Sequence, residues 1–430
     1  MIDANIAYIV FGTLGVTLLL GVPIGYALGI AATAGLVFTP IPLIYIGQTL
    51  FTGTGLFALI AIPGFILAGE LMVRAELTDR IIRVMYVVAG NVTGGLAIAS
   101  FLSCAFFASL SGSAPATTAA IGGIMIPAMV RAGYPVAWSA AVVASGGTLG
   151  ILMPPSNPMI IYGVIANVSI TGLFFAGILP ALLLLVVMIF YCWGMGKLKG
   201  FKPSGEPFTW ARFGDALWKG RAAMVMPVIV LGVIYAGLAT PTEAAMLAVL
   251  YAGGIGIFSR RLGLSDIARS MITTGRLTGA VLIVMGPAMA FGRLLTMYDV
   301  PRQVAGAFMS VSQDPLMVLF LIALLLIIVG TFMESLSAIV LLTPVLLPPL
   351  LLLGGDAVHF GILFVVLCQI GMLTPPLGVN LFVASAISNT TIEQVSKAVL
   401  PLIVVLLLFV AFLIVFPSVS TWGYHFITGR

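Results

Sequence analysis

The sequence predicts an all-α polytopic membrane protein built from two inverted-topology repeats. The first observation behind this is composition: of 430 residues, 61% are hydrophobic and 7% are charged, whereas a soluble domain carries about 25% charged residues. The second is a set of glycines and prolines that recurs at one fixed offset. The third is the placement of arginine and lysine, which puts corresponding loops of the two halves on opposite sides of the membrane.

The scarcity of polar residues excludes several classes of function. Two histidines are too few for the clusters that hydrolases and metalloenzymes use, so we expect no enzymatic activity and no cofactor. The cysteines Cys104, Cys192 and Cys368 lie scattered in apolar runs, which indicates packing rather than disulfides or a metal site. The net charge of +5 comes from loops, without a basic stretch in polar sequence, and argues against a nucleic-acid partner.

A glycine- and proline-rich segment at residues 146–158 interrupts the hydrophobic sequence of the first half. Pro154 and Pro155 lack an N–H, so the carbonyls of Gly150 and Ile151 lose their helical hydrogen-bond partners. Unpaired carbonyls in hydrocarbon cost several kcal/mol each and persist where they are buried in protein or line a polar cavity. We therefore expect a binding site at this break.

The same device recurs in the second half of the chain. One constant shift in numbering, without a gap, aligns Pro127 with Pro348, Gly133 with Gly354, Gly150 with Gly371, Leu152 with Leu373, Pro154 and Pro155 with Pro375 and Pro376, and Pro180 with Pro401. By the same reasoning, the second pair of prolines frees the carbonyls of Gly371 and Met372. Two interrupted helices in corresponding positions favour a secondary transporter whose site lies at the repeat interface.

Hydrophobic segments and loop charges divide the chain into two repeats and a linker. The expected units are a first repeat at 1–195 (hairpin about 92–130, broken helix 136–167), a cytoplasmic linker at 196–221, and a second repeat at 222–430 (hairpin about 316–353, broken helix 357–388). Arg80 and Arg83 mark an inside loop, which puts the N-terminus outside. Both hairpins are expected to be re-entrant, with tips at Ser111–Thr118 and Thr331–Ser337.

The first tip and the first break together offer oxygen ligands without a carboxylate. The tip supplies the hydroxyls of Ser111, Ser113 and Thr117, and the break supplies carbonyls and the polar side chains of Ser156 and Asn157. Such a set suits a weakly held monovalent cation such as sodium, and helix N-termini that restart after a break favour carboxylates. The alternative for the hydroxyl residues is helix packing, which they perform routinely in membranes.

In the second half, Glu334 falls on Ser113 under the shift that aligns the two breaks. A carboxylate at this depth is expensive and is a functional candidate, although it can instead cap or pair structurally. With it we class Ser335, Ser337 and Asn380 as candidates for the substrate site, together with the polar residues of the first half: Ser111, Thr117, Ser156 and Asn157.

Three further charged residues receive structural interpretations. Glu243 follows a proline at a helix start, where capping is the expected role. A looser match upstream, which places Gly69 on Gly292, also aligns Glu70 with Arg293. We interpret this last pair as interface charges near helix ends.

At these motifs the sequence resembles the large membrane subunit of tripartite ATP-independent periplasmic (TRAP) transporters. The resemblance covers essentially the whole chain, and the motifs that carry it are Ser111-Gly112-Ser113-Ala114-Pro115-Ala116-Thr117, residues 146–156, Thr240-Pro241-Thr242-Glu243-Ala244-Ala245 and Leu373-Thr374-Pro375-Pro376-Leu377-Gly378. It implies an elevator-type, sodium-coupled importer of carboxylates or acid sugars. Its implied partners are a small four-helix membrane subunit and a periplasmic substrate-binding protein.

The resemblance also implies two sodium sites. Ser113 with Gly150, Met153 and Pro155 would hold one ion, and Gly330 with Gly371, Thr374 and Leu377 a second. Met153 would act through its carbonyl. The family often has aspartate where this chain has Glu334, so the role of that residue stays open.

These observations lead to a sodium-driven importer of organic anions, such as C4-dicarboxylates or sialic acid, in a bacterial inner membrane. Two alternatives remain: a sodium symporter for divalent anions that works alone, and a passive anion channel subunit. Uptake against a gradient separates a transporter from a channel, and dependence on a binding protein separates the two kinds of transporter.

Overall fold

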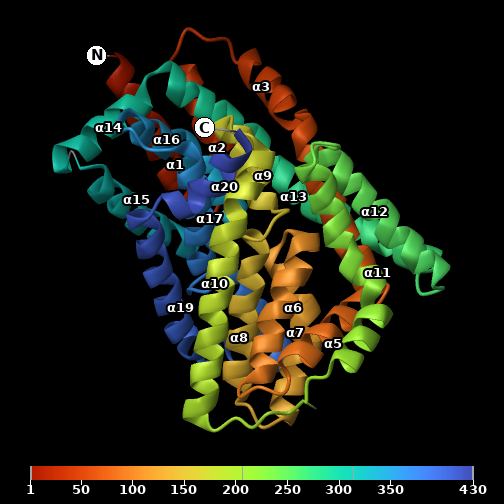
Figure 1. The fold of residues 1–430 in the computed structure, drawn as a ribbon. Helices are drawn as coiled ribbons and strands as arrows, with labels where there is room; N and C mark the ends of the chain where they lie inside the picture. Colours follow the sequence, from red (N-terminus) through yellow and green to blue (C-terminus); the bar gives the residue numbers. More distant parts are fainter. Residues whose placement is uncertain (1, 206, 313, 429–430) are drawn as a thin grey trace.

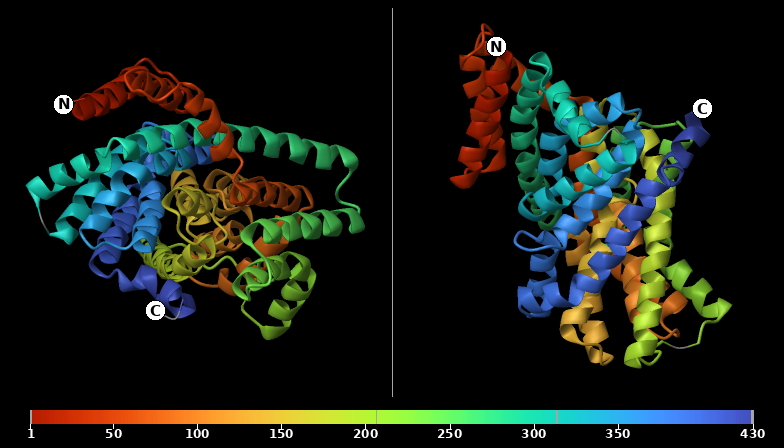
Figure 2. Two further views of the ribbon diagram at one scale, coloured as in Figure 1. Left: turned by 90° about the horizontal axis from the view of Figure 1, so that it is seen from above. Right: turned by 90° about the vertical axis from the view of Figure 1, so that its left-hand side faces the viewer.

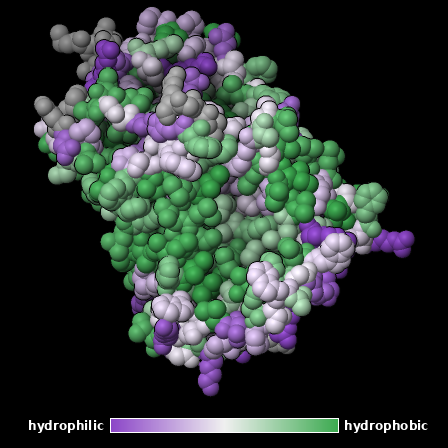
Figure 3. All heavy atoms as spheres, in the orientation of Figure 1, coloured by the Kyte–Doolittle hydropathy of each residue, from purple (hydrophilic) through white to green (hydrophobic). Residues whose placement is uncertain are grey.

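The computed structural model describes residues 2–205, 207–312 and 314–428, and all regular secondary structure in these ranges is helical (Figure 1). Eight helices within these ranges are long and apolar enough to cross a membrane. Green hydrophobic side chains fill the middle of the surface shown in Figure 3, whereas purple hydrophilic ones gather toward its ends. The expected all-α polytopic membrane fold is confirmed.

The first half contains the helices up to the end of α10. They are α1 (Ile2–Leu19), α2 (Ile24–Val37), α3 (Ile44–Thr54), the 3₁₀ turn η1 (Phe57–Ile60), α4 (Ala61–Arg74), α5 (Leu77–Ala89), α6 (Gly95–Ser111), α7 (Ala114–Arg131), α8 (Val136–Thr148), the 3₁₀ turn η2 (Leu149–Ile151), α9 (Asn157–Ala166) and α10 (Ile170–Lys199).

The second half contains the remaining helices. They are α11 (Trp210–Tyr235), α12 (Pro241–Phe258), α13 (Leu264–Met297), α14 (Val300–Val311), α15 (Pro315–Phe332), α16 (Ser335–Leu352), α17 (Ala357–Met372), α18 (Val379–Ser388), α19 (Ile392–Val415) and α20 (Ser418–Thr428). Glu243 completes a capping box with Thr240 at the start of α12, where the side chain of each accepts a backbone N–H of the other. The predicted capping role of Glu243 is therefore confirmed.

The helices form two packed groups. The frame helices are α1–α5 and α11–α13, in which α4 packs on α12, α2 on α13 and α5 on α11. The inner helices are α6–α10 and α15–α20, in which α8 packs on α7 and α18, and α15 on α17. The long α13 runs between α1–α3 and the inner helices (Figure 2, left), and it contacts the inner helix α16.

Both predicted hairpins are present as adjacent antiparallel helices, α6 with α7 and α15 with α16. The first lies in the lower half of the molecule and the second in the upper half (Figure 1). Their turns are shorter than we expected, since Gly112 and Ser113 make the first, and Met333 and Glu334 the second. Of the remaining tip residues, Ser111 ends α6, Thr331 and Phe332 end α15, and the others form the first turns of α7 and α16.

The expected linker at 196–221 is mostly helical. It continues α10 to Lys199 and belongs to α11 from Trp210 onward. The intervening loop is fixed to the inner helices, since the ring of Phe201 lies with its centroid 4.1 Å from that of Tyr134 and 5.2 Å from that of Trp138. Residue 206, within this loop, lies outside the described residues.

Candidate functional site

Both predicted breaks are present in the inner helices. Helix α8 ends at Thr148, η2 adds one 3₁₀ turn, and α9 restarts at Asn157. In the second half, α17 ends at Met372 and α18 restarts at Val379. The peptide bond between the two prolines is cis in each break. The two broken helices also pack together, since α17 contacts η2, α8 and α9.

Two of the carbonyls predicted to be stripped of partners are in fact hydrogen-bonded. The buried Ser156 hydroxyl donates to the carbonyl oxygen of Ile151 at 2.5 Å, and the N–H of Thr374 donates to that of Gly371 at 3.1 Å. The reason is local: the chain turns after each break and brings a nearby donor onto the oxygen. A carbonyl oxygen has two lone pairs, so one such bond leaves it able to accept a second partner.

The first tip lies directly against the first break. The Asn157 N–H donates to the carbonyl oxygen of Gly112 at 3.3 Å. A methyl group at Gly150 would lie 3.1 Å from the carbonyl oxygen of Ser113 and 3.0 Å from Oγ1 of Thr117. The structure therefore brings together Ser113, Thr117 and Gly150, as the sequence predicted.

Gly112 is required at this tip for two reasons. Its φ of +59° lies in the left-handed region, which side chains other than glycine rarely adopt. A methyl group there would also lie 2.9 Å from the carbonyl oxygen of Pro155, a backbone atom that cannot rotate away. Any larger residue would push the tip off the break.

The hydroxyls of the first tip differ in their bonding. The Thr117 hydroxyl donates to the carbonyl oxygen of Ser113 at 2.8 Å and lies 3.0 Å from Oγ of Ser111. Ser113 begins α7 without a capping bond from its side chain. Among Ser111, Ser113 and Thr117, Ser113 is consequently the residue whose hydroxyl does not hold the turn together.

The second tip lies against the second break in the same way. The N–H of Leu377 donates to the carbonyl oxygen of Thr331 at 3.1 Å. The backbones of Gly330 and Gly371 are in contact, because a methyl group on Gly371 would lie 2.6 Å from the carbonyl carbon of Gly330. Thr374, in the break two residues after α17, donates its hydroxyl to the carbonyl oxygen of Ile370 at 2.7 Å.

Glu334 performs the structural role that the sequence left open for it. Its carboxylate caps α16, accepting the N–H groups of Leu336 at 3.0 Å and Ser337 at 3.4 Å. The hydroxyl of Ser335 donates to its other oxygen at 3.1 Å. Both serine candidates of the second tip, Ser335 and Ser337, are therefore hydrogen-bonded to Glu334. A direct role of Glu334 in transport stays a prediction.

Buried amides extend the polar region beyond the predicted set. Asn380 donates from Nδ2 to the carbonyl oxygen of Ala144 at 3.1 Å, which ties α18 to α8. The oxygens Oδ1 of Asn157 and Asn380 have no hydrogen-bond donor in the described part of the chain. Neither polar atom of Gln369, which is fully buried in α17, has a partner there either. Such orphans need water or an ion.

Gln369 was missed by the sequence reasoning. It lies two residues before Gly371, and a side-chain amide in a run of otherwise apolar residues was the signal that could have found it. Across residues 2–205, 207–312 and 314–428, no cluster of three His, Cys, Asp or Glu side chains could hold a metal ion. The oxygens gathered around the tips and breaks are those of carbonyls, hydroxyls and amides, together with the Glu334 carboxylate that caps α16.

A cavity of about 210 Å³ opens between the first tip and the frame helices. It is lined by Ser111 and Ser113 from the tip and by Glu70 from α4, whose carboxylate lies 3.8 Å from Nε of Arg74. The second-half candidates, Glu334, Ser335, Ser337 and Asn380, do not line it. The structure thus groups each tip with its own break, and opens this cavity at the first tip alone.

Comparisons with known proteins agree with this architecture. Residues 11–419 match the family model described as "Tripartite ATP-independent periplasmic transporter, DctM component". The chain is 38% identical to the C4-dicarboxylate TRAP transporter large permease protein DctM of Pseudomonas aeruginosa, over 90% of each chain. It is 34% identical to the sialic acid TRAP transporter large permease protein SiaM of Vibrio cholerae, over 95% of this chain and 96% of that one.

Another relative is longer than this chain. The isethionate TRAP transporter permease protein DctMQ of Oleidesulfovibrio alaskensis is 44% identical over 93% of this chain, and the match spans 63% of its own length. Among solved structures, the YdaH transporter of Alcanivorax borkumensis has the same fold, with a TM-score of 0.58 at 17% identity over 90% of this chain and 89% of that one. The chain belongs to the DctM family of TRAP transporter large permeases, which are multi-pass membrane proteins and not enzymes.

Proposed function

We propose that this chain is the transport-performing subunit of a sodium-coupled importer of organic anions. The observation that carries the proposal is the meeting of hairpin tips with broken helices, where Gly330 touches Gly371 and Ser113 lies beside Gly150. These contacts gather carbonyl and hydroxyl oxygens without a carboxylate cluster, which is the ligand chemistry of a weakly held sodium ion. The proposed ligands are those given above for the two sodium sites.

The organic anion belongs to the chemistry of the relatives' substrates. Their names specify C4-dicarboxylates, sialic acid and isethionate, all of which carry a carboxylate or sulfonate. The N-termini of α9 and α18 follow the breaks, and helix N-termini favour such groups. We assign the anion to the polar residues around the tips and breaks, with Ser111, Asn157 and Asn380 among them.

The two halves act in our proposal as inverted repeats in an elevator. In the first half, Gly69 of α4 packs against Ser111 at the first tip. In the second half, Gly292 of α13 is equivalent to Gly69 by the looser repeat match, and Phe332 is equivalent to Ser111. Gly292 does not pack against Phe332. It packs against Pro344, which lies twelve residues further along the chain. At 1.5 Å per residue, the inner helices would slide about 18 Å along α13 to exchange the two arrangements.

The partners and location follow from the family. We propose a small four-helix membrane subunit and a periplasmic binding protein that delivers the solute, in a bacterial inner membrane. Arginines at the α4–α5 and α12–α13 connections support a cytoplasmic location for that end and a periplasmic N-terminus.

The test is uptake by the purified complex in proteoliposomes, with succinate, isethionate and sialic acid as labelled solutes. We expect accumulation above the outside concentration under an inward sodium gradient, and none when potassium replaces sodium. Uptake that is independent of sodium and stops at equal concentrations would identify a passive channel. Full uptake without a binding protein would instead favour a symporter that works alone.

A further inference from the structure

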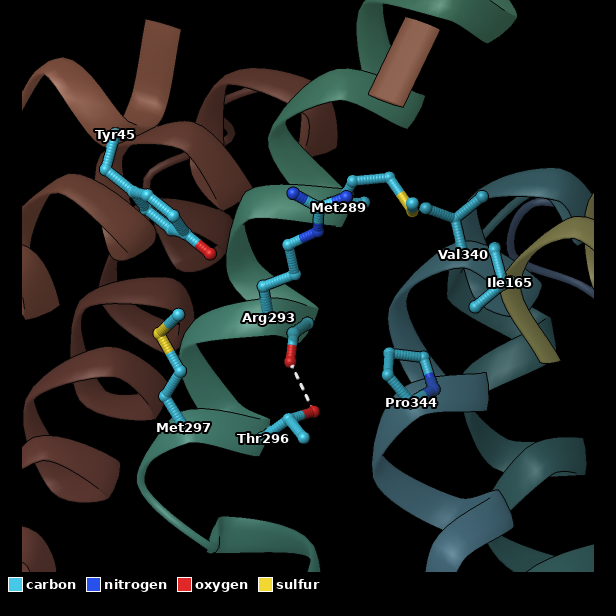
Figure 4. Close-up of a pocket in the computed structure, with 10 residues that line it drawn as sticks. Tyr45, Ile165, Met289, Arg293, Thr296, Met297, Val340 and Pro344 are labelled. Atoms are coloured by element: carbon cyan, nitrogen blue, oxygen red, sulfur yellow. Dashed lines mark hydrogen bonds between the residues drawn. The ribbon is translucent and has the colours of Figure 1, made fainter. Parts of the chain in front are cut away.

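A second cavity, of about 470 Å³, lies where the frame helix α13 faces the inner helices α9 and α16, with α3 at its side (Figure 4). Most of its wall is apolar, with Met289, Val340 and Pro344 among the lining residues. Its polar side chains are Tyr45 and Arg293, which project toward the space between the helices, and Thr296 below them. This cavity is separate from the one at the first tip.

Arg293 is the single charged residue that lines this cavity. Within the described ranges, no carboxylate forms an ion pair with its guanidinium. Nor does a hydrogen bond of that guanidinium occur there, whereas Thr296 already donates its hydroxyl to the carbonyl oxygen of Gly292 at 2.9 Å. Arg293 is exposed to the cavity and lies one turn before the end of α13, so its guanidinium is accessible to an anion that enters there.

The cavity is continuous with the face of α16 that leads to the second tip. Val340 and Pro344 follow Ser337 by three and seven residues, so the three side chains lie on one stripe of the helix. An anion held at Arg293 therefore lies on the same helix face as a substrate-site candidate. In the sliding motion proposed above, that face of α16 travels along α13 past Arg293.

The repeat relation gives independent support. Glu70 occupies the position equivalent to Arg293 and lines the other cavity beside Ser111 and Ser113. Each half thus presents one charged frame residue to a cavity that borders a hairpin helix. Glu70 has an internal partner in Arg74, whereas the described residues supply none for Arg293. Of the two charged residues, Glu70 and Arg293, only Arg293 therefore lacks a counter-charge among the described residues.

We propose that Arg293 is a binding residue for the carboxylate or sulfonate of the transported anion, in a cavity that receives the solute before the second tip reaches it. The planar guanidinium matches a carboxylate with two parallel hydrogen bonds, and the Tyr45 hydroxyl offers a donor from α3. The apolar wall leaves the guanidinium as the charged group that an entering anion meets in this cavity. The identity of the solute rests on the proposed function, whereas the oxyanion site rests on the cavity itself.

The test compares Arg293→Gln and Arg293→Lys with Arg302→Gln in the reconstituted complex. Arg302 is a matched control, because it lies on the adjacent α14, is 74% exposed and pairs with Asp299 at 3.5 Å. We expect Arg293→Gln to raise the KM for the solute at least about tenfold, Arg293→Lys to raise it less, and Arg302→Gln to stay within about twofold. Monodisperse gel filtration confirms that each variant folds.

Equal KM values for wild type and Arg293→Gln would overturn the inference while leaving sodium-coupled uptake intact. Failure of the wild type to accumulate any anion would instead defeat the proposed function. A lipid phosphate is the other source of an oxyanion, so uptake is repeated in vesicles of phosphatidylcholine with and without phosphatidylglycerol. If removal of phosphatidylglycerol raises the KM of the wild type as much as Arg293→Gln does, and the KM depends on that lipid alone, the cavity binds a lipid headgroup. Our inference would then be wrong.

Discussion

Replacing Gly371 by alanine tests the second sodium site most directly. The added methyl group would overlap the carbonyl oxygen of Gly330 and lie 2.6 Å from its carbonyl carbon, whereas carbon atoms in contact prefer about 3.5–4.0 Å. Both partners are backbone, so no side-chain rotation relieves the overlap. Helix α15 must therefore move away from α17 by about 1 Å.

The magnitude follows from that displacement. Overpacking of this kind costs about 1–3 kcal/mol, and separation of the two backbones relieves it. The same separation pulls apart Gly330 and Gly371, which are two proposed ligands of one sodium ion. Sodium can then bind only if the two backbones return to the strained contact, so the strain energy weakens binding. A penalty of about 1–3 kcal/mol corresponds to an increase of about 5–150-fold in the sodium concentration that gives half-maximal uptake.

The chain provides a matched control at the other side of the same contact. A methyl group at Gly330 would lie 3.4 Å from Cα of Gly371, which is ordinary packing distance. We therefore expect Gly330→Ala to keep its half-maximal sodium concentration within about twofold of wild type, while Gly371→Ala raises it by about 5–150-fold. The assay is sodium-titrated uptake in proteoliposomes, together with sodium-dependent thermal stability in detergent. A wild-type sodium titration for Gly371→Ala, or equal damage from both substitutions, would refute the reasoning.

Three further predictions concern the tips and the sliding motion. Ser113→Ala should weaken sodium dependence without lowering thermal stability, because the Ser113 side chain makes no capping bond; an unchanged sodium titration would count against the first site. Glu334→Gln keeps an acceptor for the cap of α16 and should lower stability by less than about 1 kcal/mol, whereas uptake should fall at least about tenfold; normal uptake would restrict Glu334 to capping. Gly292→Cys combined with Phe332→Cys should form a disulfide under oxidation that blocks uptake until reduced; absence of the cross-link during active transport would contradict the slide of about 18 Å.

Local features of the chain made the breaks and the hairpins predictable. A proline lacks its N–H wherever it occurs, so Pro154 and Pro375 interrupt helices without reference to the rest of the fold. The capping box at Thr240 is equally local, since it involves residues three apart in sequence. The same locality limited the accuracy at the tips, where the turns proved to be two residues long.

The bonding of individual oxygens was not predictable in the same way. Removal of an N–H shows that a carbonyl has lost its helical partner, but it does not show which donor replaces that partner. Ser156 reaches the oxygen of Ile151 because the chain folds back after the break, and the N–H of Thr374 reaches the oxygen of Gly371 through the turn that follows α17. Periodicity and propensity contain no information about these returns.

The sequence by itself determined that this protein is helical, lies in a membrane and contains two paired interruptions. Those properties depend on composition, on proline chemistry and on a fixed offset between residues. All three can be determined from the order of residues alone. Only the tertiary structure decided that Gly330 touches Gly371 and that Arg293 faces a cavity without a counter-charge. These outcomes depend on how close two helices approach, and that distance is set by the packing of side chains from many separate segments.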